Sequence, residues 1–328
     1  MSKGRRLPAA ALIAAVLITF CAHAASAEHA YPTRPVRLLV GFAPGGSDVP
    51  ARMLAQKLAE KLGQPFVVDN RPGAASVLAT DILAKAPADG YTLMFSTASH
   101  AVTAVYYLKL PYDPIRDFAP VASVGSVPFL LVTHPSLAAT TVKEFVAVAK
   151  AKAGQFNYGS PGTGSIGHLA QVLFTKQAGF EATHIAYKGT GPAVTAVLAG
   201  EIQFYMPNLI GAMPQVRAGK LRALGVAEAQ RSPLAPDIPT IAEGGVRGAE
   251  AGTWYGVMSP RGTPQPVVDR LNQEIVGTLR TPAFRDQLAT IGVVPDPGTP
   301  QQFAGFIRAE IEKWDGVMKF SGMKKEAY

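Results

Sequence analysis

A glycine-rich turn in the middle of the chain carries the residues best suited to bind an anion. Gly162, Gly164 and Gly167 have GxGxxG spacing within YGSPGTGSIGHLAQVLF, after an apolar stretch and at the head of an amphipathic one. Glycine lets an anion approach the backbone closely, and the first N–H groups of a helix are free to bind it. This mechanism fits a phosphate and a carboxylate equally, so the ligand class depends on other residues.

Two nucleotide interpretations of this turn fail on the residues that follow it. A dinucleotide site needs an acidic residue at the end of the next strand to bind the ribose. Here that strand ends in Tyr187-Lys188, and Glu181 precedes the strand. A nucleotide P-loop needs Lys-Ser or Lys-Thr after the glycines, and neither follows.

A second glycine-rich turn lies near the start of the chain, in GFAPGGSDVPAR. Gly45 and Gly46 stand between a buried strand and a helix, which favours a backbone nest for an anion. Asp48 is expected to be the N-cap of this helix, with Pro50 in its first turn. Hydroxyl side chains adjoin the two turns at Ser47, Ser160, Thr163 and Ser165. Amides and hydroxyls without a dense cationic cluster suit a carboxylate better than a polyphosphate.

The sequence offers no pattern for covalent or metal chemistry. No GxSxG motif occurs, and the histidines show neither HxxxH nor HExxH spacing. His168 lies one turn into its helix and is expected to be either a structural residue or a contact to a bound anion. We therefore expect no catalytic residues, no metal and no cofactor.

The N-terminal segment is typical of a secretory signal peptide. A basic head precedes an apolar run at residues 7–22, and the small residues 25–27 then offer a cleavage site. Phe20 disfavours lipidation of Cys21, because lipoprotein processing requires a small residue there. Removal of residues 1–27 would leave an exported, periplasmic chain. Later apolar runs are shorter than the roughly 18 residues of a membrane span, so no membrane insertion is expected.

Charge and length indicate an ordinary globular protein with no nucleic-acid partner. The 328 residues carry a formal net charge of +8, and no cluster of Lys and Arg interleaved with aromatics occurs. Cys21 is the one cysteine, so the exported chain has no disulfides and depends on a hydrophobic core. The chain is long enough for two domains.

Strand-like apolar runs alternate with helical patterns, which predicts an α/β fold with parallel sheets covered by helices. The first part predicts strands at 36–42, 65–70 and 91–96 and helices at 48–62 and 75–86. A long apolar segment follows at 120–135. Beyond it the sequence predicts helices at 141–153, 165–178 and 192–200, and strands at 156–160, 182–189, 202–207, 221–227 and 253–260.

Two further patterns concern the starts of helices. Both glycine-rich turns precede a helix containing Leu-Ala-Gln, so two lobes would each present a helix N-terminus at the edge where open α/β sheets bind ligands. In the C-terminal part, Thr-Pro occurs at 263–264, 281–282 and 299–300. Each pair predicts an N-cap threonine with proline at the first helical position.

The chain resembles the tripartite tricarboxylate transporter receptors, the Bug family of periplasmic binding proteins. The matching motifs in the first part are YPTRPVRLLVGFAPGGSDVPAR, GQPFVVDNRPGA, PADGYTLMFS and LPYDPIRDFAPV. Those in the second are FNYGSPGTGSIGHLA, IAYKGTGPA, GKLRALGVA, PDIPTIAEGG, TWYGVMSPRGTP and EKWDGVMKFSGMK. In one departure, the family's PGGxxDxxAR loop is one residue shorter here, which would reshape that part of the pocket.

The resemblance implies a type II periplasmic binding protein, with two α/β lobes and parallel-type sheets joined by crossing hinge strands. Lobe 1 would comprise residues 28–127 and 253–328, and lobe 2 residues 128–252. The family holds a small carboxylate, often a dicarboxylate or an aromatic acid, between its lobes and delivers it to the subunits of a membrane transporter. We expect a monomer.

By motif position, the resemblance places ligand contacts on both lobes. Lobe 1 would contribute Phe42, Ala43, Pro44, Gly45, Gly46, Ser47, Asp48, Ser96, Thr97 and His100. Lobe 2 would contribute Ser160, Gly162, Thr163, Gly164, Ser165, His168, Tyr187, Gly189 and Asn208. Trp254 is expected to pack in the hinge rather than to contact the ligand.

Two other functions stay open on the sequence. One is a binding protein of the same architecture that serves an ABC permease or a signalling partner. The other is an exported hydrolase or transferase, which would need a nucleophile with a base, or a metal cluster.

Overall fold

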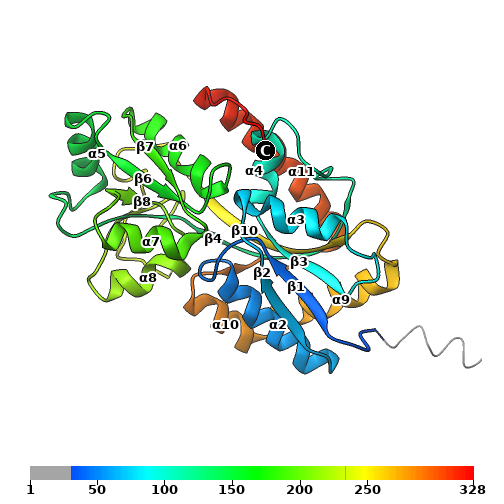
Figure 1. Ribbon diagram of the computed structural model, residues 1–328. Helices are drawn as coiled ribbons and strands as arrows, with labels where there is room; N and C mark the ends of the chain where they lie inside the picture. The colour runs from blue at the N-terminus through cyan, green and yellow to red at the C-terminus, as the bar shows by residue number, and fades with distance from the viewer. Residues whose placement is uncertain (1–30, 233) are drawn as a thin grey trace, which may run out of the picture.

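The chain forms two α/β lobes, each with its own β-sheet, in a computed structural model that describes residues 31–232 and 234–328 (Figure 1). The expected signal peptide, residues 1–27, and Cys21 lie outside the described residues. The two sheets lie side by side and are connected by two long strands, so the lobe architecture implied by the resemblance is confirmed.

The larger sheet has the strand order β11-β4-β10-β3-β1-β2. Its strands are β1 (Val36–Val40), β2 (Phe66–Asn70), β3 (Thr92–Thr97), β4 (Phe118–Pro128), β10 (Gly252–Pro260) and β11 (Val294–Pro295). Strand β1 pairs in parallel with both β2 and β3, as the sequence predicts. Strands β10 and β11 run antiparallel to their neighbours.

Helices cover both faces of this sheet, because β1 buries side chains on both sides. Leu38 and Val40 pack toward one helical layer and Leu39 toward the other, and all three are almost fully buried. The first layer comprises α2 (Asp48–Leu62), α9 (Gln265–Leu279) and α10 (Pro282–Thr290). The second comprises α3 (Val77–Ala84), α4 (Ser99–Tyr106) and α11 (Pro300–Ser321).

The smaller sheet has the strand order β7-β6-β8-β5-β9. Its strands are β5 (Leu130–Thr133), β6 (Asn157–Ser160), β7 (Thr183–Ala186), β8 (Phe204–Tyr205) and β9 (Arg222–Val226). Its helices are α5 (Val142–Ala151), α6 (Ile166–Ala178), α7 (Thr190–Leu198) and α8 (Leu209–Arg217). Phe145 of α5 is fully buried and contacts the ring of Phe204 with a centroid separation of 5.1 Å.

Two paired strands carry the chain between the lobes. Strand β4 continues through Phe129 into β5, and the chain returns along β10. Gly252 pairs with Pro128 and Thr253 with Val127, and the N–H of Phe129 donates to Ala251 O at 3.2 Å. Figure 1 shows β4 and β10 at the junction of the lobes.

This crossing explains why both sheets are mixed, whereas the sequence predicts parallel-type sheets. Strand β10 pairs with β4 while running back toward the first lobe, so it must be antiparallel to β4. Strand β5 enters the second sheet from the hinge and is antiparallel to β8 and β9. The other pairs of that sheet, β6 with β7 and with β8, are parallel.

The helix predicted at 75–86 begins later than expected. Ala74, Ala75 and Ser76 form a short 3-10 turn (η2) with φ values of 41°, 53° and 85°, all in the left-handed region. Residues with these torsions cannot continue a right-handed helix. Helix α3 therefore starts at Val77.

The Thr-Pro pairs differ in how they begin their helices. Thr281 is the N-cap of α10, as predicted, but its hydroxyl donates to Thr278 O at 2.7 Å instead of capping the helix. The prediction for Thr263 is wrong, because Pro264 is the N-cap of α9.

Thr299 forms the complete cap and gives a testable stability effect. Its Oγ1 accepts from Gln302 N at 3.2 Å, and Gln302 Oε1 accepts from Thr299 N at 2.9 Å, which is a capping box. Thr299→Ala is expected to lower the free energy of unfolding by about 1 kcal/mol. Urea denaturation measures this loss. Thr299→Ser, which keeps a hydroxyl that can accept from Gln302 N, serves as the control and should cost less; an equal loss for both variants would contradict the assignment.

Candidate functional site

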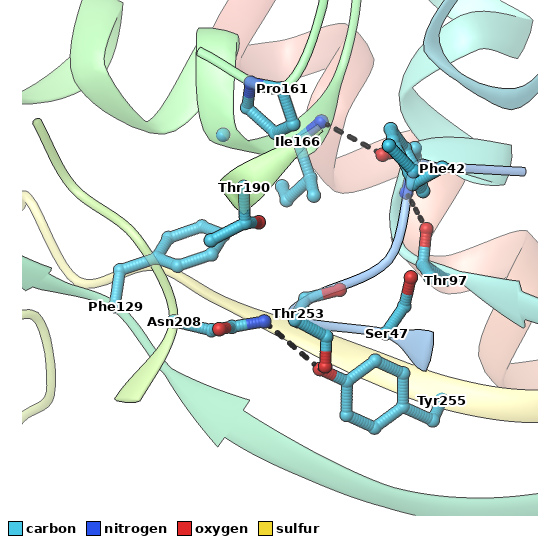
Figure 2. Close-up of a pocket in the computed structure, with 14 residues that line it drawn as sticks. Phe42, Ser47, Thr97, Phe129, Pro161, Ile166, Thr190, Asn208, Thr253 and Tyr255 are labelled. Atoms are coloured by element: carbon cyan, nitrogen blue, oxygen red, sulfur yellow. Dashed lines mark hydrogen bonds between the residues drawn. The ribbon is translucent and has the colours of Figure 1, made fainter. Parts of the chain in front are cut away.

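A cavity lies where the two lobes meet, beside the crossing strands. The cavity is small, with a volume of about 30 Å³. Lobe 1 and β10 provide Phe42, Ala43, Gly46, Ser47, Thr97, Ser99, Thr253 and Tyr255 to its lining. The crossing and lobe 2 provide Phe129, Pro161, Ile166, Gly167, Thr190 and Asn208. Figure 2 shows these side chains approaching the cavity from both lobes.

The N-terminal ends of five helices meet at this cavity. The lining residues at these ends are Ser47 for α2, Ser99 for α4, Ile166 for α6, Thr190 for α7 and Asn208 for α8. The first N–H groups of a helix have no acceptor within the helix, and the helix dipole adds a partial positive charge there. These helix ends therefore contribute positive potential to the cavity.

The lining itself contains no Lys, Arg, His, Asp or Glu side chain. Buried Asp48 is adjacent in sequence, but its Oδ2 accepts from Arg52 Nε at 2.9 Å. An anion in the cavity would meet hydroxyl, amide and backbone N–H donors without an opposing carboxylate in the lining. This combination favours an anion of low charge density over a cation or a polyphosphate.

Ser47 offers an unused hydrogen-bonding group at this site. Its side chain is buried, with 7% exposed, and its hydroxyl has no partner among the described residues. Buried hydroxyl groups nearly always have a partner in folded proteins. A ligand oxygen in the cavity would provide one.

Hydrogen bonds already join the lobes around the cavity. They run from Ile166 N to Ser99 Oγ at 3.2 Å, from Ala43 N to Lys188 O at 3.1 Å, and from Asn208 Nδ2 to Tyr255 Oη at 3.1 Å. Figure 2 shows the first and the last of them as dashed lines. The lobes are thus in direct contact around the cavity, which is a closed arrangement of the two lobes.

Comparison with known proteins gives the family. The family model for the tripartite tricarboxylate transporter family receptor matches residues 50–323. The chain belongs to this receptor family. Protein BugT of Bordetella pertussis is 40% identical over 297 residues, which cover 90% of this chain and 91% of BugT.

Solved structures of similar receptors share the fold. The structure of R. palustris Rpa4515 with adipate has a TM-score of 0.87 and 38% identity, covering 89% of this chain and 98% of that one. MatC from Rhodopseudomonas palustris with bound malate has a TM-score of 0.83 and 32% identity, covering 88% of this chain and 99% of that one. The type II binding-protein fold expected from the resemblance is confirmed.

Six of the ligand residues expected for the receptor line the cavity. They are Phe42, Ala43, Gly46, Ser47, Thr97 and Asn208. Asn208 also accepts from Gly211 N through Oδ1 at 3.0 Å and thereby caps α8. Its amide is held in place by this bond and by the bond to Tyr255.

Other expected ligand residues contact the opposite lobe instead of lining the cavity. Gly45 and Pro44 face Gly191 at the start of α7, and Gly189 faces the backbone of Ala43. In the GxGxxG turn, Gly162 faces Ala75 and Gly164 faces the ring of Tyr106, while Thr163 O accepts from Tyr107 Oη at 3.2 Å. A side chain at Gly164, with φ of 74°, would be both strained and blocked. These glycines permit close approach of the lobes.

The remaining expected residues of lobe 1 lie behind the cavity wall. The predicted capping role of Asp48 is wrong, because Ser47 already has helical torsions and Asp48 lies within α2. Ser96 is fully buried within β3. His100 is buried, and its Nε2 lies 2.7 Å from Pro114 O.

In lobe 2, the remaining expected residues support the turn before α6. Ser165 is the N-cap of α6, and its Oγ accepts from His168 N at 3.2 Å. Ser160 Oγ lies 2.6 Å from His184 Nε2 and accepts from Gly162 N. Tyr187 follows β7 and donates its N–H to Ser160 O at 2.9 Å.

Eight lining residues escaped the sequence-based prediction. They are Ser99, Phe129, Pro161, Ile166, Gly167, Thr190, Thr253 and Tyr255. Thr253 and Tyr255 alternate with Trp254 along β10, and this period of two could have separated cavity-facing from helix-facing positions. Trp254 packs against Phe303 of α11, in agreement with its expected role in the hinge.

Neither a metal centre nor a membrane span is found within residues 31–232 and 234–328. In this part of the chain no group of three or more His, Cys, Asp or Glu side chains could hold a metal ion. None of the helices described there is both long enough and apolar enough to span a bilayer.

Three buried or partly buried histidines, His100, His168 and His184, are expected to make the receptor sensitive to acid. His168 and His184 stack with their ring centroids 3.8 Å apart. Burial, and then the neighbouring His184, lowers the pKa of His168 to about 3. Burial lowers the pKa of His184 to about 4, and that of His100 to about 4. All three rings are therefore neutral in the folded protein at neutral pH.

We expect the free energy of unfolding to fall as the pH is lowered from about 6.5 to about 4. In this window the unfolded chain binds protons at these histidines and the folded chain does not, so protonation favours unfolding. Each histidine adds a slope of up to about 1.4 kcal/mol per pH unit. Urea titrations at a series of pH values measure the slope. His184→Gln should reduce it, and an unchanged slope in that variant would contradict the role of this ring.

Proposed function

We propose that this receptor captures a small carboxylate, a dicarboxylate or an aromatic acid, in the cavity between its lobes. It acts in the periplasm, without catalysis, and delivers the acid to the membrane subunits of a tripartite tricarboxylate-type transporter. The observation that carries the proposal is the meeting of five helix N-termini at a cavity whose lining contains no charged side chain.

Both sides of the cavity supply donors that suit a carboxylate oxygen. Ser47 and Thr97 offer hydroxyls from lobe 1, and Thr190 and the backbone at Gly167 line the cavity from lobe 2. Oriented N–H and O–H groups stabilise a carboxylate strongly in a site from which water is excluded. The similar receptors solved with adipate and with malate also hold dicarboxylates.

The aliphatic part of the ligand has apolar surface to contact. Phe42, Phe129, Pro161 and Ile166 form this part of the lining. A carboxylate with a short hydrocarbon or aromatic body would bury apolar area here while its oxygens reach the helix ends.

Capture follows from the division of the site between two lobes. An open receptor exposes one set of donors, and only the closed state brings both sets to the ligand. The ligand therefore shifts the population toward closure, because its contacts with the two states differ. The closed form is the one that the transporter would recognise.

A thermal-shift screen of dicarboxylates from malonate to suberate, malate and simple aromatic acids tests the proposal. A true ligand at about 100 times its dissociation constant should add about 2.7 kcal/mol to the free energy of unfolding. If no acid raises the melting temperature while a sugar or a cation does, the carboxylate assignment fails.

A further inference from the structure

Both tryptophans of the chain donate to the same carboxylate oxygen. Trp254 Nε1 and Trp314 Nε1 each lie 3.1 Å from Glu310 Oε2. The other oxygen, Oε1, accepts from Lys313 Nζ at 3.3 Å. Trp254 and Trp314 are buried, and the Glu310 side chain is only 12% exposed. The largely buried carboxylate of Glu310 thus accepts hydrogen bonds from three donors.

This carboxylate connects α11 to the strand that crosses between the lobes. Trp254 lies on β10 one residue beyond Thr253, which pairs with Val127 at the crossing. Its ring meets Phe303 of α11 edge-on, with centroids 5.5 Å apart and an interplanar angle of 86°. A Cβ at Gly256 would collide with the Phe303 ring at 2.1 Å, which shows how closely the helix and strand approach.

The neighbours of Trp254 face the other way and form part of the cavity wall. Thr253 and Tyr255 both line the cavity. Thr253 Oγ1 accepts from Ala98 N at 3.4 Å, at the start of α4. Tyr255 Oη accepts from Asn208 Nδ2 and lies 3.4 Å from Gly46 O, so it contacts both lobes.

Successive side chains of a strand point to opposite faces, so fixing Trp254 fixes the two residues beside it. An indole N–H bond to a charged acceptor is directional and strong, and it sets both the rotation of the strand and its distance from α11. Strand β10 is also held by its pairing with β4 and, from Tyr255 onward, with β3, so loss of this bond is expected to loosen the strand locally around Trp254 and not to displace it as a whole.

We propose that Glu310 is a positioning residue for ligand binding, which acts through Trp254 to hold Thr253 and Tyr255 of the hinge strand at the cavity. It does not contact the ligand itself. The proposal rests on the proposed function for its binding readout, but the position of β10 is measurable without any ligand.

The variants separate the hinge role from general stability. Trp254→Phe keeps the aromatic contact with Phe303 and removes the N–H that Glu310 accepts. Glu310→Ala removes the acceptor, and Glu310→Gln restores an oxygen acceptor of the same length. Trp314→Phe is the matched control, because it removes the other indole N–H from the same oxygen and leaves the bond from Trp254 to Glu310 in place.

Hydrogen–deuterium exchange of the unliganded protein gives the first readout. In Trp254→Phe and Glu310→Ala, amides of residues 252–256 should exchange about tenfold faster, while α9 exchanges as in the wild type. Glu310→Gln should restore most of the protection, and Trp314→Phe should leave residues 252–256 unchanged. Unchanged exchange in both Trp254→Phe and Glu310→Ala would overturn the proposal.

Ligand affinity gives the second readout, by calorimetric titration with adipate, malate and the acid that stabilises the wild type most. Trp254→Phe and Glu310→Ala should weaken binding about tenfold, and Trp314→Phe should bind as the wild type does. Equal weakening by Trp314→Phe would assign Glu310 a merely structural role. If the wild type binds no acid, the proposed function fails, while the exchange result still decides the role of Glu310.

Discussion

Replacing Thr190 by aspartate is expected to lower carboxylate affinity about 1000-fold. Thr190 is the first residue of α7 and lines the cavity. Two unit charges about 4 Å apart repel by about 4 kcal/mol at an effective dielectric constant of about 20. The introduced carboxylate would also occupy the helix N-terminus that the ligand needs, where the helix dipole stabilises it.

Thr190→Asn provides the neutral control for this substitution. It has nearly the shape of the aspartate and lacks its charge, so it should weaken binding far less. Calorimetric titration measures both affinities, and thermal melting should show that Thr190→Asp is folded and no less stable than Thr190→Asn. If the two variants bind the acid equally, electrostatic attraction by helix N-termini is not what holds the ligand.

Gly46→Ala is expected to weaken ligand binding about 100-fold by obstructing closure. A Cβ at Gly46 would lie 2.6 Å from Asn208 Nδ2 and 3.0 Å from Thr190 Oγ1, both on the opposite lobe. Asn208 cannot easily move aside, because its amide is hydrogen-bonded to Gly211 and Tyr255. The clash involves only atoms of the opposite lobe, so it would be relieved if the lobes moved apart, and we expect the stability of the unliganded protein to change little.

Gly316→Ala is the matched control, because a Cβ at this position of α11 meets no atom within 4 Å. It should bind the acid as the wild type does and be slightly more stable, since alanine favours a helix over glycine. Small-angle scattering with saturating acid should show a more open Gly46→Ala receptor. Wild-type affinity in Gly46→Ala would contradict the closed arrangement of the lobes.

Local sequence patterns predict the starts of the two helices, α2 and α6, that follow the glycine-rich turns. The turns around Gly46 and Gly162 were recognisable because a glycine-rich segment between a strand and a helix has few other uses. The resemblance assigns Ser47 and Asn208 to the ligand, and both line the cavity. The resemblance also assigns Gly162 and Gly164 to the ligand, and in the structure both lie against the other lobe. Sequence alone does not distinguish a backbone that approaches an anion from one that approaches another lobe.

Contacts that depend on how the two lobes are placed relative to each other cannot be predicted from local sequence patterns. Thr253 and Tyr255 line the cavity only because β10 crosses between the sheets with Trp254 held against α11. Ser99 reaches the cavity because it meets Ile166 of the other lobe. The directions of β5 and β10 depend on the same crossing, so periodicity alone led to parallel sheets.

The central claim is that backbone charge at converging helix ends, without any cationic side chain in the lining, selects a carboxylate. Calorimetric titration of the wild type with its best acid and with the uncharged amide of that acid tests it most directly. We predict that the acid binds at least about 100-fold more tightly than the amide. Equal binding of the acid and its amide would contradict the claim.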